Sequence, residues 1–380
     1  MLFNLTEEQK LLTKTLTDFS KNTLATQASE IDENEGFNQK AFKEMGQLGL
    51  LGITAKEEYG GSALGCIEAT LAMEKMGEAC ASTTLSYLAH SILCVNNLHE
   101  NASEAQKKKY LPALISGEKL GGMGMTEPSA GSDALGLQTK AVKKGNKYLL
   151  TGTKTFITNG PFADLFVLYA RTGSGKKDIS TFIIEKDFPG FKVGKRLHKL
   201  GMRGSPTSEL ILENCEVPEE NLVGKENGSV SHMMKNLNIE RITISGISLG
   251  IASSSLNYAS QYAKDRNQFG KSLSSFQMVQ ERIAEMSTQL EAGRALTYLA
   301  AESYDKGDRD MTLGARAKLF TAQMATKAAL DAIQILGGYG YMKEYPVERY
   351  MRDAKLMEIG AGTNEVMRII IAKKLLEFKD

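Results

Sequence analysis

The sequence predicts an α+β protein in which helices come first, a β-sheet follows, and helices return to the end. Two observations predict this order. Segments rich in Ala, Met and Leu at helical spacing fill both ends, whereas short β-branched and aromatic runs separated by turn formers fill the middle. A chain of 380 residues has room for two to three domains. We expect an N-terminal helical domain over residues 1–120, a middle β-domain over 121–227 and a C-terminal helical bundle over 228–380.

The N-terminal third opens with a helix signal. Thr6 followed by Gln9 has the pattern of a capping box, and Leu5 occupies the place of a hydrophobic staple. Helical segments continue from Ile67 to Leu114 with a polar interruption near Asn96–Ser103.

Strand-like runs in the middle third predict an antiparallel sheet. They cover Tyr148–Leu150, Thr155–Thr158, Leu165–Ala170, Ser180–Ile184 and Glu209–Leu212. Helical periodicity returns after Gly228, broken by polar turns near 266–275 and 305–311 and by glycine loops at 337–340 and 360–362.

Charge and composition exclude several classes of protein. Lys and Arg number 46 against 45 Asp and Glu, so the chain lacks the basic excess of a nucleic-acid binder. No run approaches the roughly 18 apolar residues of a spanning helix. The four cysteines form no Cys-x-x-Cys pair and the four histidines have no metal-ligand spacing. We expect a cytoplasmic protein with reduced thiols, no metal site, no nucleic-acid partner and no membrane segment.

Three familiar motifs fail. The Gly270-Lys271-Ser272 triplet lacks the first glycine of a P-loop, and no Gly-x-Gly-x-x-Gly follows a strand. The run Gly246–Gly250 matches a hydrolase nucleophile elbow, but it lies inside a helical pattern and no histidine follows Ser248.

One helix-like stretch carries an isolated carboxylate. Its seam positions are spaced 4, 3, 4, 3 and 4 residues apart and are Met233, Leu237, Glu240, Ile244, Ile247 and Ile251. Burial on this seam would disfavour the ionised form of Glu240 and raise its pKa toward the range of a general base. An inter-helix ion pair or a hydrated position in the bundle explains the same pattern.

Three glycine-containing loops are also candidate sites, each weak alone. The turn formers of 126–133 could bind an anion or form an ordinary surface turn. The loops 337–340 and 360–363 flank helix ends, where glycine serves as a C-cap or leaves backbone amides free to face a phosphate.

Six stretches in order resemble the acyl-CoA dehydrogenase family over essentially the whole chain: Met125–Asp133, Gly152–Gly160, Lys199–Ser205, Asp265–Gly270, Gln334–Gly340 and Met351–Lys355. The resemblance implies an N-terminal α-domain, a middle β-domain, a C-terminal four-helix bundle, a homotetramer built as a dimer of dimers, and FAD held without a Rossmann fold. It assigns cofactor contacts to Met123, Met125, Thr126, Gly131, Ser132, Phe156, Ile157, Thr158, Arg266, Phe269, Gln277, Gln334, Gly337, Gly338, Thr363 and Glu365. Arg266 and Phe269 would reach the FAD of the neighbouring subunit.

The position of the base selects a subclass. Many members carry a glutamate where this chain has Ala361, but the isovaleryl-CoA group keeps its base in a Glu-Arg pair that matches Glu240-Arg241. The resemblance then implies α-proton abstraction by Glu240 and hydride transfer to flavin N5. A backbone N–H at Ala361 would help to stabilise the thioester oxygen.

Two departures concern the substrate. Asn238 replaces an aspartate that contacts the pantetheine arm, and Ser231 replaces an aromatic that packs along CoA. They are neutral drift in an acyl-CoA enzyme, or they mark a relative that oxidises a prolyl or other aminoacyl group on a carrier protein. Electrons would pass to an electron-transfer flavoprotein or to O2. The substrate contacts implied are Ser132, Ser231, Asn238, Arg241, Ala361 and Gly362. A flavin-binding protein without turnover is the remote alternative.

Overall fold

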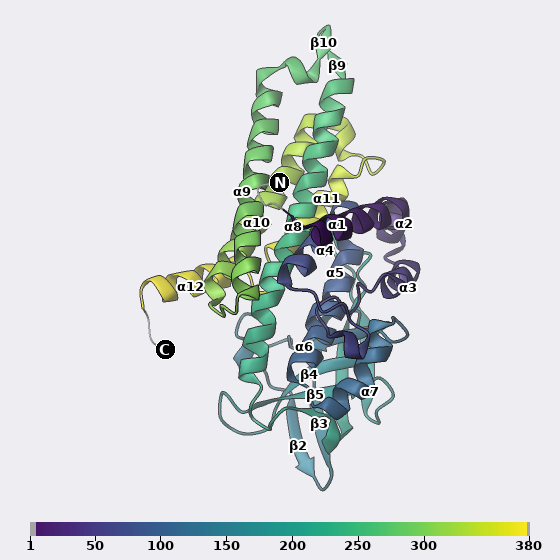
Figure 1. Cartoon of the computed structure of the whole chain (residues 1–380), viewed down its shortest axis with the longest axis vertical. Coiled ribbons are helices and arrows are strands. Elements are labelled where there is room, and N and C mark those ends of the chain that lie inside the picture. Colours follow the sequence, from purple (N-terminus) through teal and green to yellow (C-terminus); the bar gives the residue numbers. More distant parts are fainter. Residues whose placement is uncertain (1–4, 378–380) are drawn as a thin grey trace.

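Helices, a β-sheet and a long helical bundle follow one another along the chain, as the sequence predicts (Figure 1). The computed structural model describes residues 5–377. The N-terminal helices are α1 (Glu7–Phe19), α2 (Ala25–Asn34), α3 (Gln39–Gln47), α4 (Cys66–Ala79), α5 (Ala81–Leu88), α6 (Asn97–Asn101) and α7 (Glu104–Ile115), with π-helical turns at Ser20–Leu24 and Ala89–Asn96. The capping box of α1 is confirmed, since Thr6 and Gln9 exchange backbone-to-side-chain hydrogen bonds of 3.1 and 3.2 Å.

The middle segment forms a mainly antiparallel sheet in the order β6-β7-β3-β2-β4-β5-β8. Its strands are β1 (Gly121–Gly124), β2 (Lys140–Lys144), β3 (Lys147–Thr158), β4 (Leu165–Arg171), β5 (Ile179–Glu185), β6 (Phe191–Arg196), β7 (Thr207–Pro218) and β8 (Leu222–Val223). The five runs predicted as strands all lie in these elements. The parallel pairing of β1 with β4 departs from the expected antiparallel pattern.

The C-terminal part is built on α8 (Val230–Asp265), whose 36 residues make a rod of about 54 Å. Figure 1 shows α8 rising from the sheet to a distant tip that carries a short hairpin. The remaining elements are β9 (Asn267–Gln268), β10 (Lys271–Ser272), α9 (Gln277–Asp305), α10 (Met311–Leu336), α11 (Val347–Met357) and α12 (Asn364–Leu375). Helix α12 projects sideways from the bundle (Figure 1).

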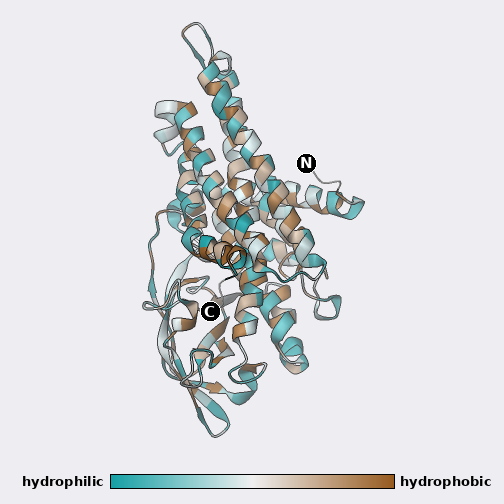
Figure 2. Cartoon of the chain, turned by 90° about the vertical axis from the view of Figure 1, so that its left-hand side faces the viewer, coloured by the Kyte–Doolittle hydropathy of each residue, from teal (hydrophilic) through white to brown (hydrophobic). Residues whose placement is uncertain are grey.

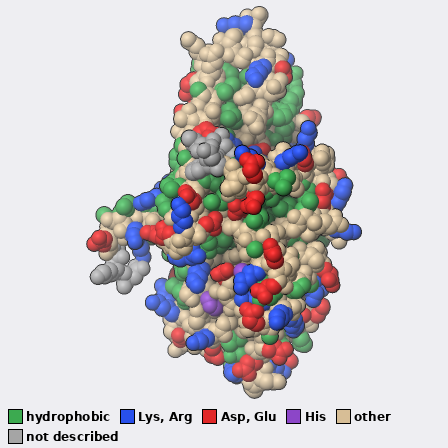
Figure 3. Space-filling model, in the orientation of Figure 1, with side chains coloured by type: hydrophobic (Ala, Val, Ile, Leu, Met, Phe, Trp, Pro, Cys, Tyr) green, Lys and Arg blue, Asp and Glu red, His purple; other side chains and the backbone are tan. Residues whose placement is uncertain are grey.

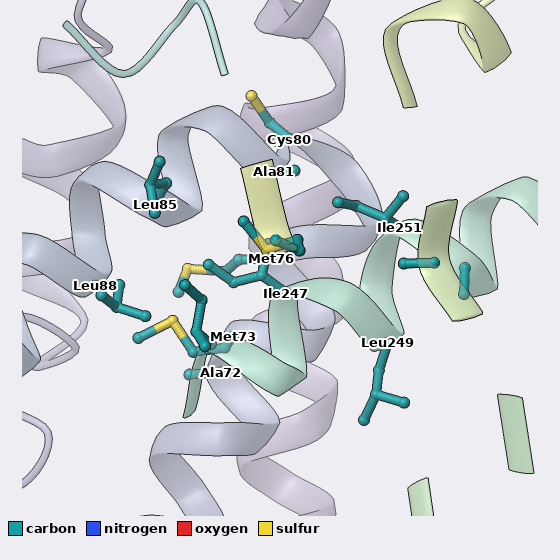
Figure 4. Close-up of a cluster of buried hydrophobic side chains, with 14 of the residues drawn as sticks. Ala72, Met73, Met76, Cys80, Ala81, Leu85, Leu88, Ile247, Leu249 and Ile251 are labelled. Atoms are coloured by element: carbon teal, nitrogen blue, oxygen red, sulfur yellow. The ribbon is translucent and has the colours of Figure 1, made fainter. Parts of the chain in front are cut away.

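The contact between α4 and α8 explains the run that resembles a hydrolase elbow. A Cβ atom added at Gly246 would lie 2.7 Å from the Thr70 carbonyl oxygen, and one at Gly250 would lie 2.6 Å from that of Glu74. These glycines therefore let the two helices approach closely. Ile247, between them, packs beside Met73 and Met76 in the core (Figure 4).

The surface agrees with the balanced charge of the sequence. Figure 3 shows acidic and basic side chains interspersed over the face it presents, and Figure 2 shows hydrophobic and hydrophilic residues alternating along the helices. All four cysteines are buried and free, as predicted. Among residues 5–377, no helix has the length and apolar character needed to cross a membrane.

Candidate active site

Glu240 is buried in α8, as the spacing predicts, although residues 236–253 of this helix are buried on every side. All six positions of the seam are in one helix, and each is buried. Glu240 itself is 6% exposed. A carboxylate, which is usually solvated, is therefore largely removed from water here, which is uncommon for this type of side chain.

Within the described part of the chain, the carboxylate of Glu240 forms no ion pair. Across residues 5–377 it accepts no hydrogen bond and has no cationic nitrogen within 4 Å. Burial raises its pKa to about 7, against the opposing charges of Arg241 and Lys318. This geometry disfavours the ion-pair explanation and leaves the carboxylate able to accept a proton near neutral pH.

The glycine loop before α12 meets this helix. Arg241 Nε donates to the Ala361 carbonyl oxygen at 3.3 Å, and Lys318 Nζ donates to that of Gly362 at 2.7 Å. Ala361 has a φ of +56°, in the left-handed region that non-glycine residues seldom occupy. Its own N–H donates to no acceptor within the described residues. A free backbone donor thus lies in the loop that contacts the residue following Glu240.

The cofactor residues assigned to the β-domain lie in β1, in the segment that follows it and at the end of β3, which together we call the β1–β3 edge. Met123 lies in β1, Met125 and Thr126 follow it, and the backbone N–H of Thr155 donates to the Thr126 carbonyl oxygen at 2.9 Å. Thr155 is followed in β3 by Phe156, Ile157 and Thr158, where the pairing of β3 with β7 is irregular. Phe156 has a φ of +58° and is 68% exposed, which presents its ring outward.

A buried ion pair supports this edge. Neither of its residues was predicted to have a role. Lys154 Nζ lies 2.7 Å from Glu127 Oε1, with both side chains almost fully buried, and also donates to the Met125 carbonyl oxygen. Gly131 and Ser132 follow in an exposed turn. Glu127 lies in the stretch Met125–Asp133 and Lys154 in Gly152–Gly160, both given above. The position of Lys154 on the buried side of an alternating strand is the feature of the sequence that could have predicted its burial.

A second group of predicted cofactor residues lies at the tip of the bundle. Arg266, Gly337 and Gly338 line one pocket of about 560 Å³. Phe269 beside it is 92% exposed, and Gln277 begins α9 nearby. Gln334, two residues before the end of α10, is exposed.

Two residues assigned to the same part of the cofactor lie elsewhere in the chain. Thr363 caps α12 through a 3.3 Å hydrogen bond from the Val366 N–H, and Glu365 follows it, so both lie beside the Ala361 loop. Within one chain the structure does not bring them to the pocket at the tip.

The two unusual substrate positions differ in their surroundings. Ser231 is exposed at the start of α8, where its hydroxyl donates to the Gly228 carbonyl oxygen at 3.2 Å. Asn238 is buried against Gly314 of α10, and among the described residues its Oδ1 has no hydrogen-bond partner.

Comparison with models of known protein families shows to which family the chain belongs. The acyl-CoA dehydrogenase N-terminal domain matches residues 6–118, the middle domain 122–215 and the C-terminal domain 230–376. The chain belongs to the acyl-CoA dehydrogenase family. It is accordingly an FAD-dependent oxidoreductase of the acyl-CoA dehydrogenase type.

Individual relatives align with almost the whole length of this chain. The mitochondrial isovaleryl-CoA dehydrogenase of Pongo abelii is 46% identical over 375 residues, which are 97% of this chain and 89% of the relative. The structure of butyryl-CoA dehydrogenase from Megasphaera elsdenii is 39% identical with a TM-score of 0.96, covering 99% of this chain and 100% of that one.

Two further solved structures that this chain resembles are of proteins not named as acyl-CoA dehydrogenases. The prolyl acyl carrier protein oxidase AnaB is 33% identical with a TM-score of 0.95, covering 98% of this chain and 100% of that one. The FAD complex of PigA is 31% identical with a TM-score of 0.95 and covers 99% of each chain. This acyl-CoA dehydrogenase family member therefore resembles proteins named for both CoA and carrier-protein substrates.

Proposed function

We propose that this enzyme oxidises an acyl thioester and that Glu240 removes the α-proton of the substrate. The observation that carries the proposal is the buried carboxylate, which has no partner among residues 5–377 and whose pKa of about 7 suits a base acting near neutral pH. Because Arg241 and Lys318 lie near Glu240 but form no salt bridge with it, the carboxylate keeps its lone pairs for the substrate.

The Ala361 loop supplies the complementary group. Removal of an α-proton places negative charge on the thioester oxygen, so a fixed donor at that oxygen lowers the barrier. The Ala361 N–H has no acceptor within the described residues. Its carbonyl oxygen is held by Arg241, directly after Glu240 in α8. The alanine side chain takes no part in such donation, so Ala361 is compatible with turnover.

The side chains at the β1–β3 edge and at the tip of the bundle have the chemical groups that FAD binding requires. An exposed aromatic at Phe156 and the adjacent hydroxyl of Thr158 suit a flat ring system, while Arg266 beside Gly337 and Gly338 suits a pyrophosphate. When bound, FAD supplies the acceptor for the hydride of the adjacent carbon. Met123, Met125, Thr126, Gly131, Ser132 and Ile157 would complete the ring site, with Phe269, Gln277, Gln334, Thr363 and Glu365 as further contacts.

The separation of these two groups supports a contribution from a neighbouring subunit to each cofactor site. They lie toward opposite ends of α8, about 54 Å long, so one FAD cannot touch both in the same chain. We therefore propose that Arg266 and Phe269 contact the cofactor of a neighbouring subunit in a homotetramer.

We also propose the domain division 1–120, 121–227 and 228–380, and a cytoplasmic location.

The acyl group is proposed to be short or branched and carried on CoA. The relative named isovaleryl-CoA dehydrogenase is 46% identical, more than the 33% of the carrier-protein oxidase, and this difference favours CoA. Ser231 and Asn238 favour the second candidate, a prolyl or aminoacyl group on a carrier protein. The acceptor is an electron-transfer flavoprotein or O2.

Anaerobic bleaching of the visible flavin band tests both candidates. The FAD-loaded protein is mixed in parallel with isovaleryl-CoA and with prolyl-loaded carrier protein. Bleaching by the CoA ester alone supports the first candidate and makes Ser231 and Asn238 neutral drift. Bleaching by the carrier protein alone supports the second, and bleaching by neither refutes both substrate assignments.

A further inference from the structure

Lys318 in α10 is a buried cation that the proposed mechanism does not use directly. It is 1% exposed, whereas lysine is almost never buried without a partner. Among residues 5–377 no carboxylate oxygen lies within 4 Å of its ammonium. The contrast is Lys154, which is buried against Glu127 at 2.7 Å.

The hydrogen bonds of Lys318 go instead to the Ala361 loop. Its Nζ donates to the Gly362 carbonyl oxygen at 2.7 Å and to Asn364 Oδ1 at 3.3 Å. These acceptors follow Ala361 by one and three residues. The cation therefore connects α10 to the loop and to the first residue of α12.

The loop needs such support because its backbone is strained. Ala361 and Gly362 have successive φ values of +56° and +91°, and the left-handed region is disfavoured for alanine. A residue stays in that region only where its surroundings hold it there. Arg241 binds the carbonyl oxygen of Ala361 and Lys318 binds that of Gly362, so two cations fix two successive carbonyl groups.

We propose that Lys318 is a positioning residue, whose ammonium holds the loop so that the Ala361 N–H faces the thioester oxygen while Glu240 removes the α-proton. This inference rests on the proposed function. The same ammonium favours the ionised form of Glu240, and burial lowers the pKa of Lys318 to about 8 without abolishing its charge at neutral pH. Lys318 thus serves the loop and the base together.

Hydrogen exchange of the FAD-loaded protein without substrate tests the positioning directly. The reporters are three amides whose hydrogen bonds define the loop and the start of α12: Gly360 to Leu356, Asn364 to Glu358, and Met367 to Thr363. Lys318→Met keeps a long unbranched side chain, one heavy atom shorter, and removes its charge and donors. Lys306→Met makes the same change on the surface at the end of α9 and is the matched control.

The expected result is exchange at least tenfold faster at these three amides in Lys318→Met, with FAD content and melting temperature close to wild type. Flavin reduction by the active thioester should slow at least tenfold as well. Lys306→Met should change none of these quantities.

Unchanged exchange in Lys318→Met overturns the proposal. Loss of FAD or of the folded state in that variant also overturns it, because Lys318 would then support the whole bundle. If no thioester reduces the wild-type flavin, the proposed function fails instead, and the exchange data still show whether Lys318 holds the loop.

Discussion

Replacing Glu240 with glutamine should stabilise the protein at alkaline pH while slowing its chemistry at least a hundredfold. Burial raises the pKa of Glu240 from 4.5 to about 7. At pH 8 the carboxylate is ionised in both the folded and the unfolded states, and keeping it buried costs roughly 3 kcal/mol of folding free energy. The cost falls as pH drops through 7 toward 4.5, because the folded state becomes protonated first.

The amide of glutamine carries no such dependence. Between pH 5 and 8, the unfolding free energy of wild type should therefore fall relative to Glu240→Gln by roughly 2 to 3 kcal/mol. Urea unfolding of both proteins at the two pH values measures this difference. Glu302→Gln, a surface change beside Lys306, is the control and should show no such effect.

The same variant should lose at least a hundredfold in the rate of anaerobic flavin reduction, the usual contribution of a general base. FAD content should stay normal, since carboxylate and amide have the same shape. Reduction at the wild-type rate, or a stability difference that does not change with pH, would refute the role of Glu240.

Three further changes probe the cofactor site, the core and the substrate. Arg266→Ala should weaken FAD binding about tenfold, with the melting temperature of the FAD-free protein unchanged, because it removes one charge-assisted contact; FAD absorbance after gel filtration measures this. Lys154→Met should cost about 3–5 kcal/mol in urea unfolding, because Glu127 is left buried without its cation, and adding Glu127→Gln should recover part of the loss. Ser231→Phe should tighten isovaleryl-CoA binding about threefold to tenfold in a flavin-band titration, and unchanged affinity would count against an aromatic contact there.

Periodicity accounts for what the sequence predicted. The order of helices and strands and the buried seam of Glu240 follow from local spacing. The same signal was available for Lys318, since Gly314, Lys318, Thr321 and Ala325 are spaced 4, 3 and 4 residues apart and are all buried. Lysine in a helix is ordinarily on the solvated face, so its burial was not expected.

Other features depend on contacts that spacing does not encode. Strand β1 is Gly-Gly-Met-Gly, without residues that favour strands, and it pairs in parallel with β4. Phe156 and Ala361 adopt a left-handed backbone although neither is glycine. The bond from Arg241 to Ala361 joins residues 120 positions apart. Only the family resemblance suggested that the two regions meet.

The pH dependence of anaerobic flavin reduction tests most directly whether Glu240 is the base. With a pKa of about 7, the ionised fraction and hence the rate should rise about tenfold between pH 6 and pH 8. The residual rate of Glu240→Gln should lack this rise. A flat wild-type profile, or the same rise in Glu240→Gln, would contradict the account.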